Sequence, residues 1–194
     1  FGEKMLGRIE NFNPDYRVEI DATARAAGMK PWQLSVLNSR TELANAPSKE
    51  CTVLYFQKHC LVGQNWDWFE DALDWTITCD LERPDGHRIV MLCEAGTLAK
   101  QGMNNCGLGL CLNFLVWPNT VEGVPVHILM RAFLDSEDIG EAKAALARAG
   151  HGQASHLLLA DSSRRVRDPR QSAARARPFA GVTGSCAAGG RNSG

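Results

Sequence analysis

The feature that most constrains the fold is a series of short strand-like runs in the middle of the chain. Each run is rich in β-branched, aromatic and other apolar residues, and polar turn signals lie between the runs. Pro84-Asp85-Gly86 is such a turn. The pattern predicts antiparallel strands. The four runs are Cys51–Gln57, Leu61–Trp66, Asp74–Leu81 and Arg88–Glu94.

Helical patterns flank this strand-rich region on both sides. Asn13-Pro14-Asp15 is a helix-start signal, and Gly28 can end that helix. Further predicted elements are helices over Pro31–Leu37 and Pro125–Leu134, a helix capped by Ser136 and ended by Gly150, a turn region over Gly102–Gly109, and strands over Leu110–Val116 and His156–Ala160. Helices, strands, helices and a returning strand predict an α+β fold and not a βαβ repeat.

Length and composition favour one globular domain. The 194 residues can bury one substantial core, and the apolar fraction of 44% is ordinary. No apolar run reaches the roughly 20 residues of a membrane helix, so no membrane partner is expected. The chain begins at Phe1 and shows no signal peptide, so we expect a missing natural N-terminus and a cytoplasmic location.

Neither the cysteines nor the histidines predict a metal site. The seven cysteines form no C-x-x-C pair, and several lie in apolar runs typical of buried thiols, which favours a reduced environment. The histidines lack metal-like or triad-like spacing and are interpreted as surface or helix-end residues. They are His59, His87, His127, His151 and His156.

After Asp161 the composition changes abruptly. Residues 162–194 hold seven arginines, one acidic residue, no lysine and few large apolar side chains. Such a segment cannot bury enough surface to offset its chain entropy, which predicts a disordered tail. A basic arm for nucleic acid would favour interleaved aromatic residues, and Phe179 alone is a poor stacking platform. We therefore expect no nucleic-acid partner and favour a frameshifted reading of this segment.

Cys51 is the leading candidate for chemistry. It stands at the start of a predicted strand, and Asp67 follows the next one. Taken alone, this pattern favours a buried strand residue over a nucleophile. A cut at the Glu50–Cys51 bond would give Cys51 a free α-amine, so that thiol and base would lie on one residue.

Further motifs occur around Cys51 in one order at consistent spacing. They are residues 38–42 (Asn-Ser-Arg-Thr-Glu), the polar run before Cys51-Thr52, residues 63–67 (Gly-Gln-Asn-Trp-Asp), 94–96 (Glu-Ala-Gly), 102–104 (Gly-Met-Asn) and 123–125 (Gly-Val-Pro). Over residues 1–161 the chain resembles the acyl-coenzyme A:6-aminopenicillanic acid acyltransferase family. These are peptidase C45-like members of the N-terminal nucleophile (Ntn) hydrolase superfamily.

The resemblance implies an αββα four-layer sandwich made as a self-cleaving precursor. Residues 1–50 would be the pro-segment that becomes the small chain, and residues 51–161 the core that begins at the nucleophile. The Cys51 thiol would attack the Glu50 carbonyl, and hydrolysis of the thioester would free the new N-terminus. The free α-amine, with a pKa near ~8, could then accept the thiol proton.

The resemblance also assigns roles to individual residues. Cys51 matches the nucleophile, and Asp67 matches the aspartate that orients its amine; the alternative for Asp67 is a strand-end acid. Asn113 matches an oxyanion donor or, alternatively, is a strand-end asparagine. Trp66 and Trp68 flank Asp67 and are both candidate pocket residues, although alternation along the strand would put one in a pocket and the other in the core. Arg40 and Glu42 read as a solvated ion pair.

Three departures limit the resemblance. Glu50 replaces a glycine found in the fungal acyltransferase, and Gln64 favours the acyltransferase branch over the bile-salt hydrolases. The family's later asparagine and arginine site residues are not found, so the predicted sandwich is partial. Expected substrates are a small-molecule amide or an acyl-coenzyme A, with no cofactor. The alternative is a catalytically incomplete fragment without activity.

Overall fold

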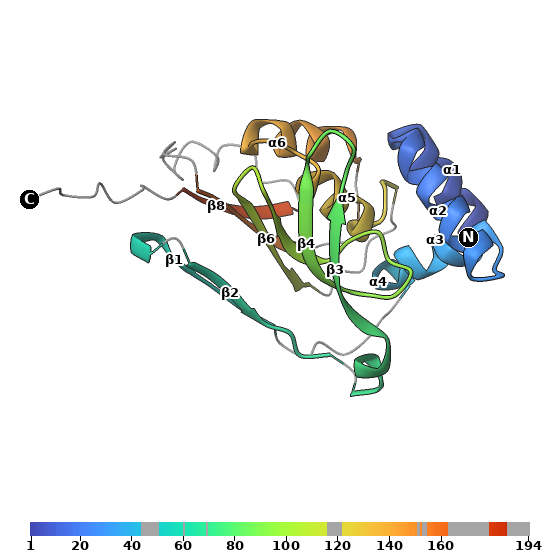
Figure 1. Cartoon of the computed structure of the whole chain (residues 1–194), viewed down its shortest axis with the longest axis horizontal. Coiled ribbons are helices and arrows are strands. Elements are labelled where there is room, and N and C mark those ends of the chain that lie inside the picture. The colour runs from blue at the N-terminus through green and yellow to red at the C-terminus, as the bar shows by residue number, and fades with distance from the viewer. Residues whose placement is uncertain are drawn as a thin grey trace, which may run out of the picture.

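The fold is described from a computed structural model. It describes residues 1–43, 51–59, 61–68, 70–115, 122–150, 152 and 155–162, with the backbone alone for Gln57 and Phe179–Ser185. A bundle of helices, a separate hairpin, and a six-stranded sheet with two further helices follow one another along this chain (Figure 1).

Four helices form the N-terminal part: α1 (Gly2–Phe12), α2 (Pro14–Ala26), α3 (Pro31–Asn38) and α4 (Arg40–Leu43). The sequence predicts α2 and α3 but not α1. At the start of α2, the Asn13 side chain accepts the N–H of Asp15 at 3.0 Å, as the helix-start signal predicts. Ile9, Ile20 and Leu34 carry the apolar faces of these helices into the main core.

The large sheet has the strand order β3-β4-β5-β6-β7-β8. Neighbouring strands are antiparallel except β7 and β8, which are parallel. The predicted turn at Pro84-Asp85-Gly86 joins β3 to β4, and Gly86 has the positive φ of 83° that such a turn requires. The strands are β3 (Thr76–Glu82), β4 (Arg88–Glu94), β5 (Gln101–Asn104), β6 (Leu108–Phe114), β7 (Ser155–Asp161) and β8 (Phe179–Ser185).

Two helices, α5 (Val126–Leu134) and α6 (Ile139–Arg148), pack on one face of this sheet. Every residue of α5 is buried. The sequence predicts a Ser136 cap for α6, but this prediction is wrong. The Asp138 carboxylate accepts the N–H of Glu141 at 2.9 Å, while the Ser136 hydroxyl donates back to Ala132 O of α5 at 2.8 Å. Asp138 is the N-cap because it directly precedes the helix, where its carboxylate oxygen reaches the free N–H of Glu141.

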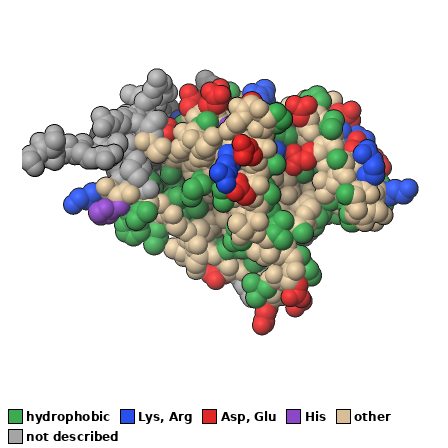
Figure 2. Space-filling view, viewed as in Figure 1, with side chains coloured by type: hydrophobic (Ala, Val, Ile, Leu, Met, Phe, Trp, Pro, Cys, Tyr) green, Lys and Arg blue, Asp and Glu red, His purple; other side chains and the backbone are tan. Residues whose placement is uncertain are grey.

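The hairpin of β1 (Thr52–Phe56) and β2 (Leu61–Asn65) lies on the other face of the sheet (Figure 1). It covers only part of that face. Val53, Tyr55 and Val62 pack on Cys111, Leu158 and Ala160 of β6 and β7. Figure 2 shows hydrophobic side chains at the surface over this hairpin, and they include Leu54, Phe56 and Leu61.

Mixed helices and antiparallel strands confirm the predicted α+β class; the four-layer sandwich stays a prediction. The short 3₁₀ helices η1 (Gln57–His59) and η2 (Glu70–Trp75) complete the elements. Within the segment predicted to lack structure, Phe179–Ser185 forms β8 beside β7, which differs from that prediction for these seven residues. The backbone of this Gly-rich stretch pairs in parallel with the buried strand β7. Residues 163–178 and 186–194 lie outside the described residues.

Candidate active site

Cys51 immediately precedes β1 and is half-buried. Its side chain lines a pocket at the end of β6, beyond the last residue that β5 covers. Elements far apart in the sequence supply the walls, so the pocket depends on the tertiary fold. The other lining residues are Arg40, Thr41, Gln64, Trp66, Trp68, Lys100, Leu112, Phe114 and His127.

A buried cluster of three charges lies beside this pocket. Glu94, at the end of β4, is 2% exposed. Its Oε1 accepts the Lys100 ammonium at 2.9 Å and also the Arg40 guanidinium. Burial alone would raise the pKa of the Glu94 carboxyl, but the charges of Lys100 and Arg40 outweigh it and hold the pKa below its ordinary value. Glu94 is therefore a carboxylate shared by two cations.

Two tryptophans complete the surroundings of these cations. The Lys100 ammonium lies 3.5 Å from the centre of the Trp66 ring and 5.3 Å from that of Trp68, and the Arg40 guanidinium lies 5.1 Å from Trp68. Such contacts are attractive because the ring face is electron-rich. The expected division between a pocket residue and a core residue is wrong, because both indoles line the pocket. Residues two apart in extended chain share a face.

His127 forms the floor of the pocket and is fully buried in α5. Its Nδ1 lies 3.1 Å from the carbonyl of Ala99, and its Nε2 lies 3.1 Å from the Thr41 hydroxyl. Since a carbonyl only accepts, Nδ1 carries the proton and Nε2 accepts from Thr41. Burial and the neighbouring cations lower the pKa of His127 to about 3. His127 lies in the first turn of α5, which agrees with the predicted helix-end position, but its full burial excludes a surface position.

Asp67 is exposed and lies just after β2. Its carboxylate accepts the Asn65 side-chain amide at 3.0 Å, and the Asn65 carbonyl oxygen in turn accepts the backbone N–H of Thr52. Within the described part of the chain, no hydrogen bond joins Asp67 directly to Cys51. The Asn65 side chain therefore links Asp67 to the backbone of Thr52, the residue that follows Cys51.

Asn113 lies on β6 opposite His156 of β7. Its neighbours Leu112 and Phe114 line the Cys51 pocket, whereas Asn113 does not. Alternation along a strand turns its side chain to the other face, the face that Cys111 shares with the hairpin. Its Oδ1 is buried without a partner among the described residues. The structure therefore does not bring Asn113 to the pocket of Cys51.

Arg40 and Glu42 do not form the expected solvated ion pair. Arg40 pairs with Glu94, while a Glu42 oxygen accepts the first N–H of α5, at Val126, at 2.6 Å. Burial is the main cause that raises the pKa of Glu42 to about 7. The intervening Thr41 binds His127. These three consecutive side chains thus fasten α4 to the end of β4 and to the start of α5.

Several motif residues hold backbone in place around the pocket. The Gln64 side chain donates to Leu112 O at 2.6 Å and accepts Leu112 N–H at 3.1 Å, so it replaces the strand partner that β6 lacks there. Asn38 binds Gly96 O and Leu98 N–H. Gly96 has φ +87° and would place a Cβ 2.8 Å from Leu37. These motif residues thus support the backbone around the pocket.

Sequence reasoning missed Lys100, Thr41 and His127 as site residues. The available signal was the short spacing of Glu94 and Lys100, since two opposite charges in otherwise apolar sequence suggest a buried pair. Glu50, the other half of the predicted cleavage bond, lies outside the described residues. Among the residues that are described, no group of three metal-ligating side chains occurs, and no helix is long and apolar enough to span a membrane.

A second, wider pocket adjoins the first one. It shares Arg40 and Trp68 with the Cys51 pocket and has a volume of about 360 Å³. Its remaining walls are largely apolar. They are Leu37, Ala72, Trp75, Glu94 and Ala95. The Cys51 pocket itself has a volume of only about 20 Å³, so the wider pocket, which Cys51 does not line, is the one with room for a compact hydrophobic group.

Comparison with known proteins identifies the class. Residues 55–170 match the sequence profile of the family described as acyl-coenzyme A:6-aminopenicillanic acid acyl-transferase. The match covers more than half of the chain and begins four residues after Cys51. The chain therefore belongs to this family of acyltransferases.

A curated relative gives the same result. The chain is 30% identical over 167 residues to the 40 kDa form of acyl-coenzyme A:6-aminopenicillanic-acid-acyltransferase from Emericella nidulans. The similarity covers 81% of this chain and 47% of the relative, so the chain spans about half the length of that protein.

Proposed function

We propose that this chain carries the nucleophile of a self-processing cysteine acyltransferase or amidohydrolase of the Ntn type. The observation that carries the proposal is the position of the Cys51 thiol, in a pocket with cations and indole rings, in a chain of this family. A thiolate beside fixed positive charge is the form of cysteine that attacks carbonyl carbon.

The proposed reaction has two stages. The Cys51 sulfur attacks the carbonyl of an amide or an acyl thioester, and the leaving amine or thiol departs with a proton. Water or an amine then attacks the acyl-Cys51 thioester, restores the thiol and carries the acyl group away. Asp67 would orient the Cys51 amine once it is free, and its present link through Asn65 supports that role. Asn113 is proposed as oxyanion donor from the family resemblance alone.

The wider pocket is proposed to receive the acyl group. Leu37, Trp68 and Trp75 offer an apolar surface beside the Cys51 pocket, which suits an aromatic or short aliphatic acyl chain. Arg40, at the junction of the two pockets, can pair with an anionic group of the substrate. Acyl-coenzyme A enters this proposal as a substrate and not as a resident cofactor.

A member of this family without activity is the second candidate. The exposed apolar side chains on the open face of the sheet favour it, because a complete catalytic fold would bury them. They are Val90, Leu92 and Met103. An active chain acylates Cys51 and an inactive one does not, so the two candidates differ in one covalent product.

The test is intact mass spectrometry of purified protein, with Cys51→Ala as the matched control. Self-processing predicts two chains, the larger with Cys51 at its N-terminus, and an uncut Cys51→Ala protein. Incubation with an acyl thioester then predicts one added acyl group on Cys51. An uncut wild-type chain that also takes up no acyl group would contradict the proposal and support the inactive candidate.

A further inference from the structure

Self-cleavage needs a group that accepts the proton of the Cys51 thiol, and the α-amine of Cys51 cannot be that group. Until the bond before Cys51 is broken, the Cys51 nitrogen is an amide and has no lone pair available to accept a proton. Some other group must take the proton from the thiol in the first step. The inference below rests on the proposed function in taking Cys51 as the nucleophile, and its experiment includes a readout independent of cleavage.

The described side chains around the pocket leave few candidates for this base. The lone pair of His127 Nε2 already accepts the Thr41 hydroxyl, and its other nitrogen donates to a carbonyl. Glu94 is held as a carboxylate by two cations and is a weak base. Asp67 is exposed and bound to Asn65. Each of these groups is occupied or too weakly basic.

Lys100 is the candidate that geometry favours. It is 5% exposed, and its ammonium lines the same pocket as the Cys51 thiol. Among the described residues its one hydrogen-bond partner is Glu94, at 2.9 Å, and the Trp66 ring covers another side at 3.5 Å. An ammonium carries three N–H groups, so donors remain for a sulfur or an oxygen anion in the pocket.

Two charged and two neutral titratable groups, from four parts of the chain, face this amine. Arg40 of α4 and Glu94 of β4 flank it, the Cys51 thiol lies before β1, and neutral His127 of α5 forms the floor. Burial and the Arg40 charge lower the pKa of Lys100 to about 8, although Glu94 and Cys51 act in the opposite direction. A substantial fraction of Lys100 is then the neutral amine at mildly alkaline pH, where it can accept a proton.

We propose that Lys100 is the catalytic base of the first, self-cleaving step. The neutral Lys100 amine takes the thiol proton, and the resulting ammonium stays beside the thiolate. Sulfur forms a bond to the preceding carbonyl carbon, the bond from that carbon to the Cys51 nitrogen breaks, and Lys100 returns the proton to this nitrogen. The products are a thioester and the free α-amine, and Lys100 ends neutral as it began.

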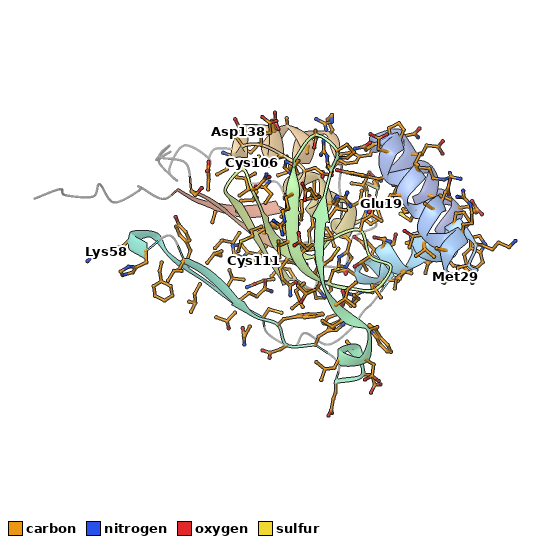
Figure 3. All side chains as sticks on the ribbon, in the orientation of Figure 1. Glu19, Met29, Lys58, Cys106, Cys111 and Asp138 are labelled. Atoms are coloured by element: carbon orange, nitrogen blue, oxygen red, sulfur yellow. The ribbon has the colours of Figure 1, made fainter. Side chains whose placement is uncertain are left out.

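The experiment compares three variants of the full chain, Lys100→Met, Lys100→Arg and Lys58→Met. Lys58 is exposed at the outer tip of the hairpin (Figure 3) and is the matched control. Two rates are measured, alkylation of each cysteine by iodoacetamide with peptide mass mapping, and appearance of the new N-terminus. The exposed Cys106 is the internal reference thiol.

Lys100→Met is expected to slow alkylation at Cys51 about tenfold relative to Cys106, since the stabilising charge is gone. It should also slow cleavage by about 10²-fold or more, the usual contribution of a general base. Lys100→Arg keeps the charge but cannot accept a proton, so alkylation should stay near the wild-type rate while cleavage is lost. Wild-type cleavage should accelerate from pH 6 to pH 8 as Lys100 loses its proton.

Equal alkylation ratios in Lys100→Met and wild type would overturn the inference, as would wild-type cleavage in Lys100→Arg. The same losses in Lys58→Met would also overturn it. A wild-type chain that never cleaves defeats the proposed self-processing instead, and the alkylation ratio then still decides whether Lys100 acts on the Cys51 thiol.

Discussion

The two faces of the large sheet differ in how completely they are covered. On the helix side, alternate residues of β4 (Ile89, Met91 and Cys93) are buried against α5 and its neighbours. On the other side, the intervening residues Val90 and Leu92 remain exposed. Among the described residues, the hairpin packs there on β6 and β7.

The difference separates what holds the fold together from what forms the site. Most of the apolar burial lies on the helix side, so stability is concentrated there. Cys51 lies at the start of the hairpin, in a pocket at the end of β6 that Leu112 and Phe114 also line. Its position depends on a small apolar contact and on the Gln64 bridge to β6. A chain of this kind can be well folded and still hold its nucleophile loosely.

The largest effect is expected for the helix side of the sheet. Phe133→Ala removes a fully buried ring from α5 and should lower the free energy of unfolding by about 3–5 kcal/mol. Urea denaturation followed by circular dichroism measures this. The matched control is Leu54→Ala on the exposed side of the hairpin, where a change under about 1 kcal/mol is expected. Similar losses in both variants would remove the contrast between the faces.

A second effect concerns the contact of Glu42 with the start of α5. Because its folded pKa is raised to about 7, protonated Glu42 favours folding, and this stabilisation is lost as pH rises from about 4.5 to 7. Glu42→Gln should abolish that loss, which is at most about 3.5 kcal/mol because each pKa unit corresponds to about 1.4 kcal/mol. Melting temperatures from pH 4.5 to 8 test it. Parallel pH profiles for the two proteins would contradict a raised pKa for Glu42 in the folded state.

The hairpin side should respond more weakly to the loss of its polar bridge. Gln64→Ala leaves both backbone groups of Leu112 without their partner and should cost about 1–2 kcal/mol. The hairpin should also open more often, so the buried Cys111 beneath it should be alkylated faster. Gln33→Ala, at the start of α3, is the control and should leave Cys111 protected. Unchanged protection in Gln64→Ala would mean that the apolar contact alone holds the hairpin.

The smallest effect is expected on the uncovered strands. Val90→Thr, at an exposed position of β4, should change stability by no more than about 0.5 kcal/mol and should reduce aggregation seen by light scattering. The neighbouring residue, Met91, is buried against the helices, so Met91→Thr should be strongly destabilising. If Val90→Thr destabilises as much as Met91→Thr, something covers this face in solution.

Local signals predict the elements of this fold well. The Asn13 cap, the Pro84-Asp85-Gly86 turn and the alternation in β4 each act within a few residues, so a single sequence shows them. The family membership was also predictable, because its motifs keep their order and spacing. By contrast, α1 has no cap signal, since no side chain caps its start.

The site was predictable only in part, because it is formed by long-range contacts. Arg40 and Glu94 are 54 residues apart, and Thr41 and His127 are 86 apart. No local pattern shows that such side chains meet. For Lys100 the sequence offers one weak signal, its spacing from Glu94, because lysine is seldom buried unless it is paired. For Asn113 the motif match was misleading in the other direction. It suggested a site residue, but a motif match cannot tell which face of a strand a residue occupies.

The contacts of α1–α4 have a consequence for any break in the backbone ahead of Cys51. The Tyr16 hydroxyl donates to Asp135 at 2.8 Å, and Arg131 pairs with Glu19 at 2.8 Å, in addition to the Arg40–Glu94 pair. While the backbone is intact, the connection gives these helices a local concentration of the order of millimolar or more. After a cut they would become a separate peptide ligand. The fraction of the protein that retains this peptide would then fall on dilution. Loss of the peptide would also remove Arg40 from the pocket.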